Sequence, residues 1–438
     1  MNNNTKIFDD IETVSKNLLS VFERMKEVPG MYDDICDKKK SICRAIPEQI
    51  RSGVVKIAVV GSIKSGKSTF INSFLNEDLL KRGAGVVTSI ITKVRKGDIS
   101  KAAILLKSWD EINQEIEKAL LFFPDFENRF IEIDEKGFDL RRKNDRKLLK
   151  KVNEQLRSDL SVTKKGIRPE SIILANAMEG YEFVKDVVQA DASTIEFTNK
   201  RFQEHKKFTG TDSFAFFVKD VSLSVETKGL DPQIEIADCQ GSDSTNPLHM
   251  AQIEDYLVSA SLIIYLISSR TGLREADIRF LTIIQKMGLM DNILFVVNSD
   301  FSEHESLEDL INVEKTIKNE LAYFKSDIEL FTFSSLYNLF CKSKQDLSIK
   351  NLKRLNQWKE DFDFVNYSDT MKSDFDSTLA ALLKKKRFML LVANHIEHIR
   401  IIANDAEKRA EIFNELLNEN VSKAGLAVEN LEDMHKRA

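Results

Sequence analysis

The stretch of sequence that decides the fold covers residues 54–75 and reads VVKIAVVGSIKSGKSTFINSFL. Residues 54–60 form an apolar run typical of a short buried strand, and residues 69–75 have a helical pattern. Between them, residues 61–68 match the spacing of a P-loop. The backbone amides of such a loop bind phosphate oxygens, and the positive end of the following helix points at them. The stretch therefore predicts a site for a nucleoside triphosphate and its magnesium.

Each residue type in the loop has a physical reason to be there. The two glycines permit the turn and the close approach of the phosphates, the second lysine reaches the β- and γ-phosphates, and the serine after it completes a Mg²⁺ shell. The residues that we assign to nucleotide binding in this segment are Gly61, Ser62, Ser65, Gly66, Lys67, Ser68 and Thr69.

A magnesium–triphosphate site also needs a carboxylate at the end of a neighbouring strand. Asp238 fits, because it ends the apolar run 234–237 and opens the segment Asp238-Cys239-Gln240-Gly241. We assign Ser68 and Asp238 to the metal, and we expect Gly241 to present its amide to the γ-phosphate. The alternative is an ordinary aspartate at a strand end.

The remainder of residues 54–335 alternates strand-like and helix-like segments, which predicts an α/β fold with a mainly parallel sheet and helices on both faces. Residues 214–226 alternate less cleanly and predict an edge strand. The charged block at about 108–210 is interpreted as a helical insertion that decorates the sheet, with a partner-binding surface as the other interpretation. The expected strands are 234–237, 262–267, 293–297 and 330–333, and the expected helices include 275–287 and 306–324.

Both flanks of this region have heptad patterns, which predict long helices with a packed seam. We therefore expect neck helices at 1–50, the nucleotide domain at 51–340, and further neck or stalk helices at 341–438. The N-terminal seam would be Ile7, Ile11, Val14, Leu18, Val21, Met25 and Val28; the C-terminal one begins with Met389, Val392, Ile396, Ile399, Ala403 and Ala406.

Composition sets the wider bounds. A chain of 438 residues predicts two or more domains, and a net charge of −5 argues against a nucleic-acid partner. The 4 cysteines lack metal-binding spacing and indicate free thiols in a reducing cytoplasm. We find no secretory signal and no apolar run near the roughly 18 residues that span a bilayer. We expect a cytoplasmic protein, with at most a peripheral membrane contact. The basic run 384–387 is either such a contact or, as we favour, a solvated face.

One further motif carries a family resemblance. Residues 82–88, Arg-Gly-Ala-Gly-Val-Val-Thr, resemble the first switch of dynamin-superfamily large GTPases, and the P-loop with residues 69–75 is similar to that of the bacterial members. Residues 217–221 are similar too, and the likeness covers roughly residues 50–340. The resemblance implies that Gly83 and Gly85 lie at the nucleotide. It also implies that the Thr88 hydroxyl binds Mg²⁺, while the Thr88 backbone holds the attacking water.

The chain departs from that family inside the P-loop. The family glutamine that assists hydrolysis would fall at Ile63, which cannot do so. At the next position dynamins place a serine that helps hold a monovalent cation, and guanylate-binding proteins hold an arginine. Here it is Lys64. Our hypothesis is that the Lys64 ammonium neutralises charge developing between the β- and γ-phosphates. The alternative is a solvent-facing lysine.

Base recognition is predicted from residues 293–300, ILFVVNSD. Aligned without a gap on the family's Asn/Thr-Lys-x-Asp motif, Asp300 takes the guanine-reading place and Asn298 replaces the lysine. Aligned on Asn298 as the first residue, the aspartate falls one place short. We prefer the first alignment, and Ser334 resembles the last base-contacting loop. GTP is the expected nucleotide, with ATP as the alternative.

The resemblance implies a GTPase that forms a nucleotide-dependent dimer through its nucleotide face and moves a helical lever to remodel membranes. In that family the membrane-binding tip lies at the far end of the stalk, and this chain is too short to return from such a tip. We therefore expect either that the lipid contact belongs to a partner, such as a second dynamin-like subunit, or that this chain is one part of a longer architecture. The alternative from another class is a regulatory P-loop switch whose helices dock a protein partner without membrane work.

Overall fold

The computed structural model describes residues 3–81, 90–122, 137–163, 169–190, 193–227, 229–239, 247–385 and 387–437. The chain packs as two units, one formed by residues 1–54 with 385–438, and the other by residues 55–384. The domain limits expected from the sequence stay predictions, and each unit is described by itself below.

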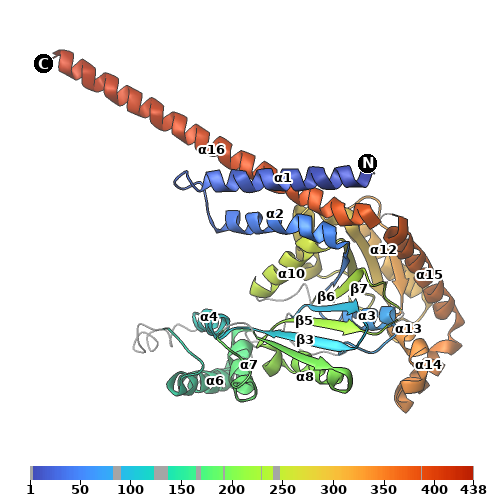
Figure 1. Cartoon of the computed structure of the whole chain (residues 1–438). Helices are drawn as coiled ribbons and strands as arrows, with labels where there is room; N and C mark the ends of the chain where they lie inside the picture. The colour runs from blue at the N-terminus through green and yellow to red at the C-terminus, as the bar shows by residue number, and fades with distance from the viewer. Residues whose placement is uncertain are drawn as a thin grey trace. The chain divides into compact units, whose positions relative to one another are not determined.

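The larger unit is built on a nine-stranded sheet with the order β4-β3-β5-β2-β6-β1-β7-β8-β9 (Figure 1). Five of its strand pairs are parallel and three, all involving β2 or β3, are antiparallel. The predicted α/β fold with a mainly parallel sheet is therefore confirmed. The strands are β1 (Val55–Val60), β2 (Thr92–Lys96), β3 (Lys101–Leu106), β4 (Thr194–Thr198), β5 (Val218–Val225), β6 (Ile234–Asp238), β7 (Leu262–Ser268), β8 (Ile293–Asn298) and β9 (Leu330–Phe333).

Helices cover both faces of the sheet, which explains why strands such as β7 and β8 are apolar over almost their whole length. On one face, Ile253, Phe280 and Ile317 come from three helices and join a single core with the strands. On the other face, the ring of Phe375 lies 5.7 Å from Phe70 and 5.4 Å from Phe333. The first face carries α10 (Pro247–Ser259), α11 (Glu275–Lys286) and α12 (Leu307–Leu321); the second carries α3 (Lys67–Leu75), α13 (Ser335–Lys342) and α15 (Phe362–Lys385).

The prediction of an edge strand at 214–226 is wrong. β5 lies between β3 and β2, and the edge position belongs to β4, inside the charged block at 108–210. The alternation of β5 reflects a strand whose two faces differ in burial, which local pattern alone cannot separate from a strand at the edge. The other elements of this unit are α4 (Trp109–Leu120), α6 (Lys143–Thr163), α7 (Pro169–Val184), η1 (Asn199–Glu204), α8 (His205–Gly210), α9 (Asp212–Ala215), η2 (Met290–Asn292), η3 (Lys344–Asp346) and α14 (Ile349–Glu360).

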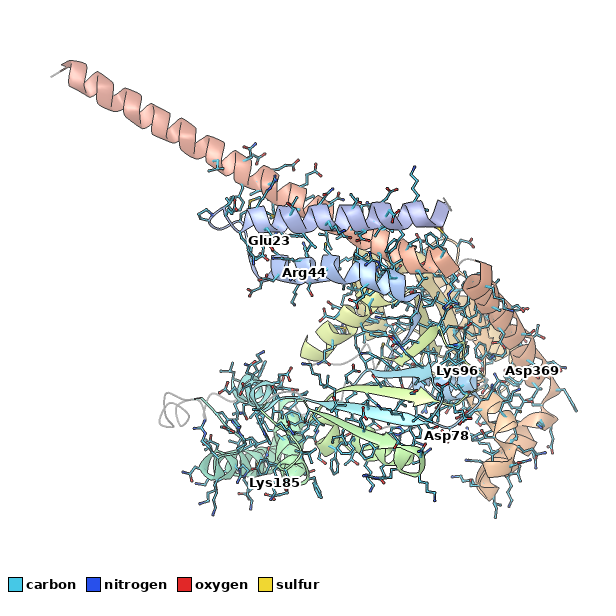
Figure 2. The ribbon with its side chains drawn as sticks, viewed as in Figure 1. Glu23, Arg44, Asp78, Lys96, Lys185 and Asp369 are labelled. Carbon is cyan, nitrogen blue, oxygen red and sulfur yellow. The ribbon has the colours of Figure 1, made fainter. Side chains whose placement is uncertain are left out.

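The smaller unit is a bundle of α1 (Asn3–Met25), α2 (Asp34–Ser52) and α16 (Arg387–Arg437), so the predicted bundle of N- and C-terminal helices is confirmed. α16 runs on well past the ends of α1 and α2 (Figure 1). Figure 2 shows Glu23 of α1 close to Arg44 of α2, and the Arg44 Nη2 atom lies 3.9 Å from the Glu23 carboxylate. Among the described helices, none is long and apolar enough to cross a membrane.

The heptad register expected for these helices is partly wrong. Val14 and Val21 are 42% and 40% exposed, while Ser15 and Phe22 are buried in their place. On α16, Met389 and Ile396 are exposed, as a seam position should not be. A helix that packs between two others buries a broader stripe with a period near 3.6 residues, rather than a two-stranded coiled-coil seam.

A pair of neighbouring substitutions tests this register. We expect Phe22→Ala to destabilise the bundle by about 3–5 kcal/mol, because it empties a fully buried site. The half-exposed Val21→Ala should change the stability by under about 1 kcal/mol. Native-state hydrogen exchange of the α1 amides measures both changes. Equal effects of the two substitutions would contradict the observed register.

Candidate functional site

Of the predicted site residues, those that the structure describes lie at the carboxyl ends of the parallel strands, which meet on one side of the sheet. In the strand register Val59 of β1 lies beside Asp238 of β6, which brings Asp238 next to the loop that follows β1. Asn298 at the end of β8 lies beside Phe333 at the end of β9. The P-loop, Asp238 and the segments after β8 and β9 thus share one edge.

Three residues give the P-loop its left-handed turns. Gly61, Lys64 and Gly66 have φ angles of 144°, 67° and 95°. A Cβ atom on Gly61 would come within 2.2 Å of the Leu266 carbonyl oxygen, so only glycine fits. Lys64 is the exception, because a residue with a side chain rarely adopts this conformation. Its side chain is exposed and makes no hydrogen bond or ion pair with any residue in the described ranges.

Lys67 supplies the charge of the loop. Its side chain is buried, and its Nζ atom donates hydrogen bonds of 2.9 Å to the carbonyl oxygens of both Gly61 and Ser62. The ammonium is therefore held inside the curve of the loop, where a phosphate group would meet it. These two carbonyl oxygens accept from two of the three ammonium donors, which offsets part of the cost of burying the cation.

Ser68 and Asp238 meet although they lie 170 residues apart. The Ser68 hydroxyl donates a 2.6 Å hydrogen bond to Asp238 Oδ2. Burial raises the pKa of Asp238, while the charge of Lys67 and the hydrogen bond from Ser68 act in the opposite direction. Its second oxygen, Oδ1, is buried and has no hydrogen-bond partner among the described residues. A buried carboxylate oxygen beside a hydroxyl is the kind of ligand set that Mg²⁺ prefers.

Asn298 ties the P-loop to the segment after β9. Its Nδ2 atom donates to the Ser65 carbonyl oxygen at 3.0 Å, and its Oδ1 atom accepts from the Ser335 amide at 3.0 Å. The fit is close, because a Cβ atom on Gly66 would lie 2.1 Å from Asn298 Nδ2. The sequence carried no signal for this connecting role.

Asn298 is one of three residues predicted for base recognition, and the other two, Asp300 and Ser334, are also engaged within the protein. Asp300 accepts a hydrogen bond from the Ser302 amide at 3.0 Å and two from Arg354 of α14. Ser334 is buried at the start of α13, where its hydroxyl accepts from the Tyr337 amide at 3.3 Å. Their assignment to the nucleotide remains a prediction.

Four further predicted residues lie outside the part of the chain that the structure describes. Gly83, Gly85 and Thr88 lie in residues 82–89, and Gly241 lies in residues 240–246, all outside the described ranges. Thr69 lies half-buried in the first turn of α3.

Sequence reasoning missed Arg274, whose Nη2 atom donates a 2.8 Å hydrogen bond to the Ile63 carbonyl. Arg274 comes just before α11, and its backbone amide donates to Asp277 at 3.0 Å. This arginine supports the P-loop at the residue before Lys64.

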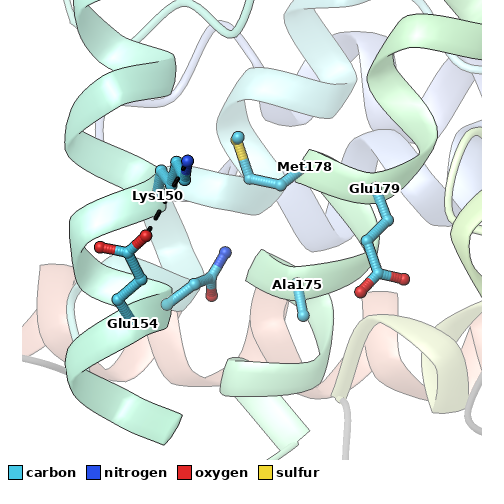
Figure 3. A pocket seen from close by; sticks show the side chains of 6 residues that line it. Lys150, Glu154, Ala175, Met178 and Glu179 are labelled. Atoms are coloured by element: carbon cyan, nitrogen blue, oxygen red, sulfur yellow. Dashed lines mark ion pairs between the residues drawn. The ribbon is translucent and has the colours of Figure 1, made fainter.

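No other described cluster competes with this site. Among the described residues, no group of three or more His, Cys, Asp or Glu side chains could hold a metal ion. A hollow of about 300 Å³ lies between α6 and α7 (Figure 3), and the one ion pair drawn in it joins Lys150 and Glu154 at 3.9 Å. It is lined by Lys150, Asn153, Glu154, Ala175, Met178 and Glu179, none of which is a predicted nucleotide residue.

Comparison with known proteins gives consistent matches. The family model described as Dynamin family matches residues 57–300. Dynamin-like protein A of Bacillus subtilis (strain 168) is 24% identical over 338 residues, which are 71% of this chain and 25% of that protein. A bacterial dynamin-like protein of Nostoc punctiforme is 35% identical over 57 residues, which are 13% of this chain and 8% of that protein. The chain therefore spans at most about a quarter of these relatives.

One solved structure, described as an oligomerised bacterial dynamin pair with a mechanism for long-range sensing and tethering of membranes, has a TM-score of 0.49 and 16% identity. The match covers 97% of this chain and 50% of that one.

Proposed function

Because this chain belongs to the dynamin family, we propose that it hydrolyses GTP to GDP and phosphate and couples its nucleotide state to dimerisation and to movement of its helices. The observation that carries the proposal is the 2.6 Å hydrogen bond from Ser68 to Asp238. This bond joins the P-loop, which would hold the phosphates, to the end of β6. The segment that follows β6 contains Gly241, which is predicted to contact the γ-phosphate. Thr88 and Gly241 are the predicted γ-phosphate contacts in the two segments that would relax after hydrolysis.

Magnesium is the proposed cofactor. The residues that would hold it are Ser68 and Asp238, joined by the predicted Thr88, and the buried Asp238 Oδ1 atom fits such a role. When bound with the nucleotide, the ion would neutralise phosphate charge. Lys67 would bind the β- and γ-phosphates and exclude water from that side of the loop, because its side chain is buried.

We propose that Lys64 takes part in hydrolysis. It has a left-handed backbone conformation within the loop and an exposed side chain, and Arg274 donates to the carbonyl of the residue just before it. Strained conformations of this kind cluster at functional sites.

Lys64→Met keeps the length of the side chain and removes its charge. We expect kcat to fall about 100-fold, as for loss of one preorganised donor at a developing charge. Lys64→Arg, which keeps the charge, should retain much more activity. Phosphate release is measured at matched potassium and sodium concentrations. If Lys64→Met releases phosphate at the wild-type rate in both salts, Lys64 is a solvent-facing residue with no part in hydrolysis.

The proposed biological work is membrane remodelling, and it rests on the family to which the chain belongs. Two experiments test it on the full chain. Thermal unfolding with GTP, GDP, ATP and ADP identifies the nucleotide that stabilises the protein. Flotation with anionic liposomes, with and without a non-hydrolysable GTP analogue, tests membrane binding. Binding of GTP without flotation in any state, alone or with a partner dynamin-like subunit, would favour the alternative of a switch that docks a protein.

A further inference from the structure

The carboxylate that we propose as the guanine reader is bound by an arginine from a distant helix. Arg354 Nη2 lies 3.1 Å from Asp300 Oδ1 and 3.2 Å from Asp300 Oδ2, so one nitrogen bridges both oxygens. Both side chains remain accessible, at 37% for Arg354 and 39% for Asp300. The pair joins the loop after β8 to α14.

Asp300 does not need Arg354 to hold its position. The Ser302 amide donates to Asp300 Oδ1 at 3.0 Å, which closes a local turn of the aspartate side chain on its own backbone. Arg354, in turn, has other partners. Its guanidinium lies 4.4 Å from the centre of the Trp358 ring, and Nη2 also donates to Ser302 Oγ at 3.2 Å. Trp358 is itself fixed, because it packs against Phe301 and Phe340.

Guanine and Arg354 would compete for the same two carboxylate oxygens of Asp300. The base presents two adjacent N–H donors, from N1 and the exocyclic amine, and a single carboxylate accepts both when each oxygen takes one. A nitrogen 3.1 Å from one oxygen and 3.2 Å from the other lies close to the plane that bisects the carboxylate, so it takes part of the acceptor capacity of both oxygens. Adenine has no such pair of donors on that edge, so ATP gains nothing when the carboxylate is released.

We propose that Arg354 determines nucleotide specificity by competing with guanine for Asp300. GTP binds at the expense of the Arg354–Asp300 pair, and the stack on Trp358 gives the guanidinium a place to remain after release. This inference rests on the proposed GTP-binding function and adds a residue of α14 to it. Removal of Arg354 should therefore strengthen GTP binding selectively.

The test uses Arg354→Met in the full chain, because methionine keeps an unbranched apolar side chain against Trp358 and removes the donors. Calorimetry with GTP and with ATP, in the presence of Mg²⁺, measures the affinities. We expect GTP affinity to rise about twofold to fivefold, as for the loss of a half-exposed ion pair, with ATP affinity unchanged. The matched control is Lys353→Met, which removes a charge from an exposed lysine on the same helix and should alter neither affinity.

Two further variants, Asp300→Asn and the double variant with Arg354→Met, complete a double-mutant cycle. In an Asp300→Asn background, Arg354→Met should leave GTP affinity unchanged, because the competition has already been removed. If Arg354→Met does not fold, Arg354→Lys is measured instead. A lysine keeps the charge but cannot hold the same planar contact, so it should bind GTP more tightly than wild type by a smaller factor.

Two results would overturn the inference. GTP affinity that is unchanged or lower in the Arg354 variant would show that the arginine positions Asp300 or is irrelevant to the base. An equal rise for ATP would show a non-specific effect of charge. Both results differ from failure of the proposed function, in which the wild-type chain would bind and hydrolyse no GTP.

Discussion

We expect Lys67→Met to bind GTP at least about 100-fold more weakly than the wild-type chain, the largest loss from any single substitution considered. The ammonium is buried within the loop and held by the carbonyls of Gly61 and Ser62 at 2.9 Å. Charge-assisted hydrogen bonds to phosphate in such a water-poor site are about twice as strong as neutral ones, and methionine supplies none. Calorimetric titration with GTP and Mg²⁺ measures the loss.

The control for Lys67→Met is Lys359→Met, which removes the same charge from an exposed position on α14. It should bind GTP as wild type does. Since two P-loop carbonyls lose a donor in Lys67→Met, its thermal unfolding is recorded as well, so that lost binding is separated from lost folding. Binding within about threefold of wild type in a folded Lys67→Met protein would contradict the phosphate role of the lysine.

The second large loss of GTP affinity is expected for Gly66→Ala, for two structural reasons. The backbone has a φ of 95°, and the added Cβ atom would lie 2.1 Å from Asn298 Nδ2. The left-handed conformation alone costs a side chain about 1–2 kcal/mol. The clash would also push Asn298 off the Ser65 and Ser335 backbone, so that the phosphate loop and the segment after β9 lose their tie. We expect GTP affinity to fall about 10- to 100-fold, measured by the same titration.

Gly272 offers a matched control for this second prediction. It also has a positive φ, of 59°, but a Cβ atom there would meet only Ile317 Cγ1 at 4.0 Å. Gly272→Ala should therefore show the backbone cost without the clash. The double variant Gly66→Ala with Asn298→Ala should bind better than the sum of the two single losses predicts. If Gly66→Ala binds GTP as tightly as Gly272→Ala does, the hydrogen bonds from Asn298 to the Ser65 and Ser335 backbone are not important for GTP binding.

The parts of the site that could be predicted from the sequence are those formed by short continuous segments. The P-loop is one short segment with a known physical job, and Asp238 follows an apolar run that reads as a strand. β7 and β8 appear as continuous apolar runs because both of their faces are buried, and the shorter runs of β1, β6 and β9 are interrupted by Lys56, Glu235 and Thr332. The predicted resemblance to the dynamin superfamily is confirmed by the matched family model.

What the sequence could not predict depends on contacts between distant residues. β2 carries Lys93, Arg95 and Lys96, and such charges hide a strand from a search for apolar runs. The place of β5 within the sheet depends on which strands flank it, and strand order leaves no local pattern. For the same reason Arg354 gave no signal: it lies 54 residues after Asp300 in a helix of ordinary composition.

The helical bundle made from the two ends of the chain has a consequence for biosynthesis. α1 and α2 leave the ribosome before α16, although Val392 and Ile402 of α16 belong to the same buried core as Phe22 and Cys43. The intervening unit, about 330 residues long, takes on the order of tens of seconds to make at about 5–20 residues per second. Through that interval the apolar face of the first two helices stays without its partner. Because transiently exposed apolar surface favours aggregation, we expect the nascent chain to be most prone to aggregate during this interval.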